Sequence, residues 1–317
     1  MMPSARDRRS RPGVATLVII ATRQDAPLQP WQGKGFQGMF TKLPDTSKAA
    51  VFSVLVMVLA VGASLLIRAQ GHVPGPGLWA VWMFTPTMAT LIMLLVVTRE
   101  GYSKEGWKSL GLHRLGLRVW WIAFGVTSLI TLAATAIVWA TPLASFAVPE
   151  GGILATLIDF LFKVAMFTLT FTLGEEIGWR GYLLPKLLPL GRNRALVLVG
   201  LVWTPWHLVL FFLTPFFPMG NVLIFVPLFV GTIVAASFFF GYLRLYTGSV
   251  WPASIGHSVH NAAWDTLGAL TATSSPVLVN LYLVGDNGIL ILVATILGAI
   301  WVGRMLRSGM NEAQPAQ

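Results

Sequence analysis

The chain has 317 residues, of which 55% are hydrophobic and only 11% are charged, and its net charge at pH 7 is +10. An ordinary soluble domain has about a quarter charged residues, so this composition, with a mean hydropathy of +0.72, excludes that class and indicates a membrane protein. The absence of cysteine excludes disulfides, Cys-ligated zinc and thiol catalysis. Eight of the 22 Lys and Arg residues precede position 49, and most others lie in short loops between apolar runs. This distribution is typical of orientation in a membrane and not of nucleic-acid binding.

The N-terminal segment has the charge pattern of a signal peptide but lacks a cleavage site. Four arginines between Arg6 and Arg11 precede a ten-residue apolar run at 13–22, yet no small-residue cleavage site follows. We interpret residues 1–38 as a disordered basic extension or the product of an upstream start codon, with Met39 opening the ordered protein. Residues 39–306 are predicted to form one intramembrane domain, and residues 307–317 a polar tail.

Apolar runs dominate the rest of the chain. A helix needs about 20 residues to cross a bilayer, and eight runs reach or approach that length, which predicts an all-α membrane protein of about eight transmembrane helices. Pro86 is expected to bend the second run, and the 13 Trp residues are expected mainly in belts at the membrane interfaces. The eight runs occupy residues 49–67, 78–98, 119–140, about 158–184, 195–213, 222–242, 250–270 and 288–306.

Basic residues alternate from loop to loop along this pattern. They gather in the loops 99–118, 185–194 and 243–249 and in the C-terminal tail, whereas the intervening loops have almost none, with Arg68 the exception. By the positive-inside rule, both termini and the basic loops face the cytoplasm. We therefore expect an integral protein of a bacterial cytoplasmic membrane.

Ionisable side chains inside the runs are few, and each is costly in hydrocarbon, so they indicate a water-filled path or a reaction centre. Residues three and four apart share a helix face, so Glu176 reaches Arg180 and His257 lies beside Asn261. Counted along their helices at about 1.5 Å per residue, Glu175, His207, His257 and Asn261 fall at a similar depth on three runs. The polar residues inside these runs are Glu175, Glu176, Arg180, His207, His257, His260, Asn261 and Asp265.

Three motifs follow one another on successive predicted helices: Glu175-Glu176-x-x-x-Arg180, Trp203-x-x-x-His207 and His257-x-x-x-Asn261. Together they resemble the signature motifs of the CPBP family, the CAAX proteases and bacteriocin-processing enzymes also called Abi proteins, and in particular its type II CAAX prenyl endopeptidases. Members of that family are intramembrane endopeptidases. The resemblance covers about residues 49–306, and one departure is that the second motif begins with Trp203 where Phe is usual. An aromatic packing role survives that change.

The resemblance implies a role for each motif residue. Glu175 is the base that activates water, assisted by His207, while His257 and Asn261 stabilise the oxyanion. Glu176 orients its neighbours. Arg180 pairs with Glu176 and offsets its burial, and with Trp203 it supports the site structurally.

The motif residues are compatible both with a catalytic zinc and with metal-free hydrolysis. Glu175, His207 and His257 are a two-His, one-carboxylate set that suits a catalytic zinc. No His-Glu-x-x-His element is present, however, and the motif residues satisfy the needs of hydrolysis unaided. We prefer metal-free catalysis and keep zinc as the alternative.

Residues outside the motifs receive simpler interpretations. His260 is expected to pack or to support the site from behind, and Asp265 is a candidate partner of Asn261 one turn away. Asp159 and Lys163 are expected to form a local ion pair near the outer end of their run.

The sequence thus predicts an intramembrane endopeptidase whose cavity opens to the cytoplasm. Its substrate is a CAAX-like, bacteriocin or other membrane-associated peptide, and its partners are that peptide or a membrane protein and the lipid bilayer, not nucleic acid. Two other classes stay open: a non-enzymatic membrane scaffold or regulator of the immunity type on the same fold, and a proton-coupled transporter. A full set of Glu175, Glu176, His207, His257 and Asn261 favours the enzyme, since a scaffold needs no hydrolytic constellation.

Overall fold

The computed structural model describes residues 43–71, 75–217 and 219–306. The predicted extension at 1–38 and the polar tail at 307–317 therefore lie outside the described residues. Within the described part, helices form nearly all regular structure, and the one sheet is the two-residue antiparallel pair of β1 and β2, with Ser145 opposite Ala272. The predicted all-α class is confirmed.

The first two elements of the described chain are long helical units. They are α1 (Asp45–Ala69) and the bent unit of α2 (Pro76–Met83), α3 (Thr85–Ile92) and the π-helix η1 (Met93–Val97). A loop with the 3₁₀ turns η2 (Glu100–Tyr102) and η3 (Leu117–Val119) and the short α4 (Lys104–Ser109) leads to α5 (Trp120–Trp139). After β1 (Ser145–Phe146), a long unit combines α6 (Gly152–Leu169), α7 (Phe171–Glu176), the π-helix η4 (Ile177–Leu183), α8 (Leu184–Leu187) and the 3₁₀ turn η5 (Leu188–Leu190).

Four further helices complete the bundle. α9 (Arg192–Leu213), α10 (Val222–Thr247) and α11 (Trp251–Ala269) precede β2 (Thr271–Ala272), the π-helix η6 (Leu278–Leu283) and α12 (Ile289–Met305). Pro205 lies inside α9 without ending it.

The predicted count of eight spans is not confirmed. Each of the eight apolar runs is helical, but among the described residues five helical units are long and apolar enough to cross a membrane, or six if the bent unit counts as one span. α12 is a shorter apolar helix of 17 residues. α11 carries the polar residues of the third motif, which explains why its 19 residues are not apolar enough.

The bend in the second run lies where Pro86 is expected to act. The unit is bent by 52° at Phe84, between its two halves. A proline has no N–H to offer the carbonyl one turn before it, and the carbonyl of Trp82 instead accepts a hydrogen bond of 2.8 Å from the Thr85 hydroxyl. This exchange satisfies the backbone in a setting where water is scarce.

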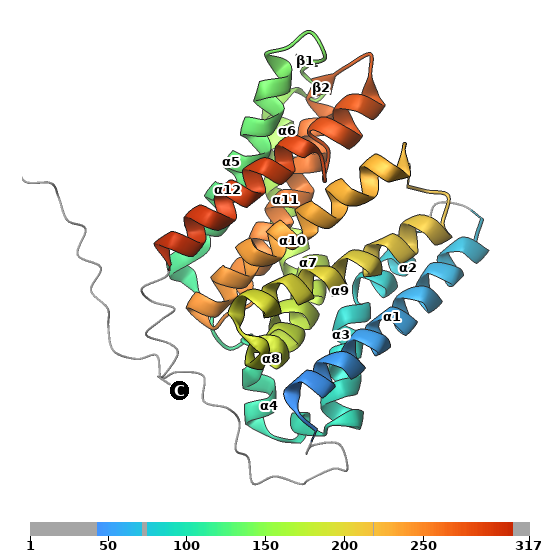
Figure 1. The fold of residues 1–317 in the computed structure, drawn as a ribbon. Helices are drawn as coiled ribbons and strands as arrows, with labels where there is room; N and C mark the ends of the chain where they lie inside the picture. The colour runs from blue at the N-terminus through green and yellow to red at the C-terminus, as the bar shows by residue number, and fades with distance from the viewer. Residues whose placement is uncertain (1–42, 72–74, 218, 307–317) are drawn as a thin grey trace, which may run out of the picture.

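Two ends of the bundle are distinct (Figure 1). At one end, which we call the basic end, lie α4, α8 and the loops rich in Lys and Arg, and at the other end, the hairpin end, lie β1 and β2. The long unit from α6 to η5 runs between the two ends and is interrupted at Thr170, whose φ of −127° and ψ of −97° are not helical. This break separates α6 from α7, the helix that carries the glutamates.

Ion pairs close one side of the basic end. The buried carboxylate of Glu100 lies 2.7 Å from Lys48 Nζ and 3.1 Å from Lys186 Nζ, and Asp45 also contacts both lysines. The network ties together α1, the loop before α4, and α8. Its burial means that each charge depends on its partners.

Arg244 closes the other side of the same end. Its Nε donates to the carbonyl of Arg180 at 3.0 Å and its Nη2 donates to the carbonyl of Ser109 at 2.7 Å. Trp251 donates its indole N–H to the carbonyl of Leu112 at 3.0 Å. The loop that contains α4 is therefore bonded down onto the ends of α10 and α11.

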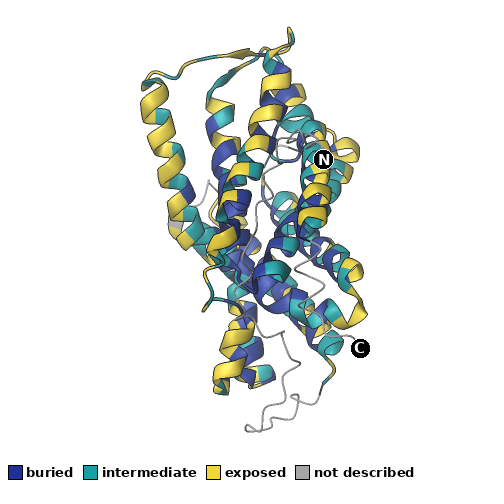
Figure 2. Ribbon diagram, turned by 90° about the vertical axis from the view of Figure 1, so that its left-hand side faces the viewer, coloured by how far each residue is buried: buried dark blue, intermediate teal, exposed yellow. Residues whose placement is uncertain are grey.

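Buried residues gather in the middle of the bundle, and exposed residues lie on the outward faces of the helices (Figure 2). The expectation that Trp residues lie mainly in interfacial belts is wrong for four of them. Trp82, Trp179, Trp203 and Trp206 are each no more than 3% exposed and pack in the core. Rings of Trp82 and Trp206 stack at 3.7 Å between centroids.

Candidate active site

Glu175 lies at the centre of the bundle, 1% exposed, near the end of α7. Its Oε2 accepts hydrogen bonds from the indole N–H groups of Trp203 at 2.9 Å and Trp179 at 3.3 Å. A buried carboxylate needs such donors, and here two large rings supply them while excluding lipid. Oε1 is left facing His257.

Glu176 is fully buried and points to a different set of partners, as the rotation between successive helical residues requires. Its Oε1 lies 2.8 Å from Arg180 Nη1 and 3.0 Å from His257 Nδ1. The predicted pairing of Glu176 with Arg180 is confirmed. The Arg180 guanidinium also lies over the ring of Trp203, with 4.4 Å from Cζ to the centroid.

His257 connects the two glutamates. Its Nδ1 is bonded to Glu176, and its Nε2 lies 3.9 Å from Glu175 Oε1, too far for a direct hydrogen bond. The ring stacks on Phe240, with 5.7 Å between centroids and 23° between planes, and meets Trp203 edge-on. A carboxylate on one nitrogen and aromatic rings on the faces fix the orientation of the imidazole, which leaves Nε2 directed to the Glu175 side.

His207 faces the same space from α9, but it forms no hydrogen bond with Glu175 among the contacts of the described residues. Its Nδ1 lies 3.2 Å from the carbonyl of Trp203 on its own helix. Aromatic rings surround it, the nearest being Trp206 at 4.6 Å and Phe229 at 5.3 Å between centroids. The structure therefore places His207 in the cavity wall and not in the hydrogen-bonded cluster.

A cavity of about 580 Å³, which we call the central cavity, lies beside this cluster. Glu175, His207, His257 and Asn261 all contribute to its wall. The wall is largely aromatic, and its volume lies within the range of about 300–1,000 Å³ that is usual for ligand sites. Four motif residues from three helices thus meet around one space, as their shared depth predicts.

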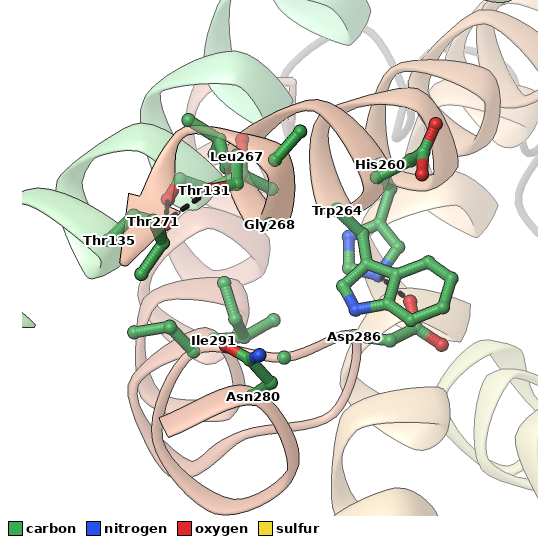
Figure 3. A pocket seen from close by; sticks show the side chains of 14 residues that line it. Thr131, Thr135, His260, Trp264, Leu267, Gly268, Thr271, Asn280, Asp286 and Ile291 are labelled. Carbon is green, nitrogen blue, oxygen red and sulfur yellow. Dashed lines mark hydrogen bonds and ion pairs between the residues drawn. The ribbon is translucent and has the colours of Figure 1, made fainter. Parts of the chain in front are cut away.

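A second cavity, of about 360 Å³, adjoins the first, and we call it the polar chamber (Figure 3). The two share His260, Trp264, Asp265, Asn280 and Asp286 as lining residues, so they are neighbouring parts of one hollow. His260 is more than a packing residue. Its Nε2 lies 2.6 Å from Asp286 Oδ1, and this pair stands between the two spaces.

Asp286 lies outside the membrane helices, just before α12. Burial alone would raise the pKa of its carboxyl, but the hydrogen bond from His260 and the charge of that imidazole lower it. Asn287 adds a further hydrogen bond, at 3.0 Å. Asp286 is therefore held as a carboxylate that faces the polar chamber.

The expected pairing of Asp265 with Asn261 is not found. Asp265 is instead ion-paired with Lys163 of α6, which also lies 2.7 Å from Asp159. The predicted pair of Asp159 and Lys163 is confirmed. Asp265 and Asn261 both line the central cavity, and the carboxylate of Asp265 pairs with a charged partner on the neighbouring helix instead of the neutral amide on its own helix.

The sequence predicts a cavity open to the cytoplasm, the side on which the positive-inside rule places the basic end, but the lining residues of the two cavities do not reach that end. In the described part of the chain, no lining residue of either cavity belongs to the loops at that end, and hydrogen bonds and ion pairs close it. The lining residues instead extend to the hairpin end. They include Asn280 of η6, and Phe217, Asp286 and Asn287, which lie in segments that precede or follow helices at that end.

The set of Glu175, His207 and His257 does not form a ligand cluster in this structure. Among the described residues, no group of three or more His, Asp or Glu side chains is arranged to hold a metal ion. One His257 nitrogen is engaged by Glu176, and His207 Nδ1 faces a backbone carbonyl.

Sequence reasoning missed three contributors to the site. Trp179 is four residues after Glu175, so the helix spacing that linked Glu176 to Arg180 was sufficient to identify it. Phe240, which stacks on His257, carried no signal in an aromatic-rich helix. Asp286 lies in a turn between apolar runs, where an acidic residue is ordinary.

Comparison with known families agrees with this geometry. Residues 157–263 match the family model described as "Type II CAAX prenyl endopeptidase Rce1-like". The matched segment holds all three motifs, from Glu175 to Asn261, and confirms the resemblance to the CPBP family of CAAX proteases. At the family level the match supports an intramembrane protease, hence a hydrolase. No curated protein matches the chain significantly.

Proposed function

We propose that this chain, whose central segment matches the CAAX endopeptidase family, hydrolyses a peptide bond within the membrane with water activated by Glu175. One observation carries the proposal. Glu175 and Glu176, adjacent in sequence, are both buried and are linked through His257, at 3.9 Å and 3.0 Å, beside a cavity of about 580 Å³. Two buried carboxylates are too costly to be kept only for packing.

The groups divide the tasks of hydrolysis. Glu175, anchored by two indole N–H groups, accepts a proton from a water in the central cavity and later returns it to the leaving amine. The carbonyl oxygen of the substrate becomes an oxyanion in the transition state, and His257 Nε2 and the Asn261 amide donate to it. Glu176 accepts the Nδ1–H of His257 and so keeps Nε2 on the substrate side.

The local charges support this division. When His257 is protonated, its charge and that of Arg180 match the charges of the two glutamates, so that the cluster is then neutral as a whole. A protonated His257 is also the better oxyanion donor. His207, with Nδ1 facing its own helix, has Nε2 available to assist the water from the opposite wall.

The reaction requires no metal in this proposal, because the carboxylate, imidazole and amide groups supply base, acid and oxyanion donors. We expect purified protein to contain substoichiometric zinc by elemental analysis and to keep its activity in strong chelators. Stoichiometric zinc that is lost in His207→Ala would overturn the preference.

The proposal is tested by incubating the reconstituted protein with a peptide library and analysing products by mass spectrometry. Wild-type protein should produce defined cleavage products, and Glu175→Gln should reduce their rate by several orders of magnitude while inserting and purifying normally. Asp159→Asn is the matched control, since Asp159 is an exposed acid that lines neither cavity. Comparable cleavage by the Gln variant would reject Glu175 as the base.

A further inference from the structure

We propose that the central cavity is entered from the hairpin end through the polar chamber, and that the substrate is a peptide or membrane-protein segment exposed on the non-cytoplasmic face. This inference rests on the proposed endopeptidase function and names the side from which its substrate comes. It replaces the cytoplasmic entry that the sequence suggested.

The position of the polar chamber supports entry from the hairpin end. The polar chamber is lined by residues from the hairpin-end halves of α5 and α11, by Thr271 of β2 and by the segment before α12 (Figure 3). The side chains of Asp265 and Asp286 are 58% and 40% exposed. Carboxylates that are exposed to this extent require water and not hydrocarbon around them, so the chamber is in contact with the aqueous phase.

The central cavity is built to hold water as well as apolar groups. Thr127 and Thr232 line it at mid-helix, and each has a buried hydroxyl without a hydrogen-bond partner among the described residues. Buried hydroxyls are normally satisfied by protein or by ordered water. Water that reaches these positions has a polar path to them past His260 and Asp286.

The basic end of the bundle is closed. Glu100 with its two lysines, and Arg244 with the carbonyls of Ser109 and Arg180, occupy the basic end with buried, mutually dependent contacts. Opening a path there requires breaking buried ion pairs, which leaves buried charges without their partners. At the hairpin end, the pair of His260 and Asp286 between the two cavities is partly exposed, so a path past it breaks no fully buried ion pair.

The distribution of Lys and Arg assigns the two ends of the bundle to the two sides of the membrane. Lys and Arg are concentrated in the loops at the basic end, and this excess marks the cytoplasmic side. The hairpin end then faces outward. A substrate that reaches Glu175 through the polar chamber comes from that side, with its apolar side chains in the aromatic part of the central cavity and its polar part in the chamber.

The test uses single cysteines, since the natural chain has none. Thr232→Cys introduces a thiol deep in the central cavity, and Ser64→Cys is the matched control, because Ser64 is also a buried hydroxyl residue but lines neither cavity. A small, charged, membrane-impermeant thiol reagent added to intact cells should label Thr232→Cys and leave Ser64→Cys unlabelled. Labelling of Thr232→Cys only from the cytoplasmic side, or from neither side, would overturn the inference.

A second variant links entry to function. Gly268 lines the polar chamber, and a Cβ at this position meets no atom within 4 Å, so Gly268→Cys should fold normally. A bulky impermeant maleimide added from outside should reduce cleavage by Gly268→Cys at least tenfold and should not affect wild-type protein. Unchanged cleavage after complete modification would contradict entry through the chamber.

Failure of the two proposals can be told apart. Labelling of Thr232→Cys does not depend on peptidase activity, so outside labelling without any cleavage by wild-type protein would reject the enzyme and keep the route. Cleavage that depends on Glu175, with Thr232→Cys labelled only from inside, would keep the enzyme and reject the route.

Discussion

Trp203 has more than a packing role at the residue scale. The family usually has Phe at this position, which has no N–H, whereas here the indole donates to Glu175 Oε2 at 2.9 Å and its ring lies beneath the Arg180 guanidinium. The departure from the motif therefore adds a hydrogen bond to the proposed base. The sequence indicated an aromatic residue but not that its nitrogen would reach the carboxylate.

Trp203→Phe tests this contribution. A hydrogen bond to a charged group is worth about 1.5–3 kcal/mol, and each 1.4 kcal/mol corresponds to about a tenfold change in rate. We expect turnover to fall by at least about tenfold but not to vanish, because the ring remains. Trp179→Phe removes the longer bond of 3.3 Å and should have a smaller effect. Equal turnover in Trp203→Phe and wild-type protein would show that only the ring matters.

At the element scale, the fold and the site differ in how well the sequence predicts them. Every apolar run is helical, because a helix is the structure in which such a run satisfies its own backbone hydrogen bonds in lipid, and the fixed spacing of helical residues placed Glu176 beside Arg180. Contacts between helices follow no such rule. The approach of Lys163 to Asp265 and of His260 to Asp286 depends on how helices rotate and stagger, which no local pattern records.

The buried carboxylate of Glu100 is expected to hold the basic end together. Glu100→Ala leaves Lys48 and Lys186 without their shared partner, and removal of one member of a buried ion network costs about 3–5 kcal/mol. We expect a clear fall in the midpoint of thermal unfolding in detergent. Because Glu100 lines neither cavity, the folded fraction should keep its turnover.

Glu105→Ala is the control for this variant, since Glu105 is an exposed acid of the same loop and its loss should change stability by no more than about 0.5 kcal/mol. Similar midpoints for the two variants would mean that the ion network at the basic end contributes little.

At the scale of the whole molecule, the alternation of basic loops predicts the orientation of the bundle. Ser145 and Ser274 lie exposed at the hairpin end, and Asn193 lies exposed at the basic end. With single cysteines, an impermeant reagent added to intact cells should label the first two positions and not the third. Outside labelling of Asn193→Cys would invert the bundle, and with it the side assigned to the polar chamber.

The chemical fate of water tests the central claim most directly. If Glu175 activates water for peptide hydrolysis, cleavage in water enriched in oxygen-18 should place one heavy oxygen in each new carboxyl terminus, as read by mass spectrometry of the products. Reconstituted wild-type protein should give this signal, and Glu175→Gln, purified and inserted in equal amount, should give none in the same time. Absence of labelled product from wild-type protein with every peptide offered, or equal labelling by both proteins, would contradict the account.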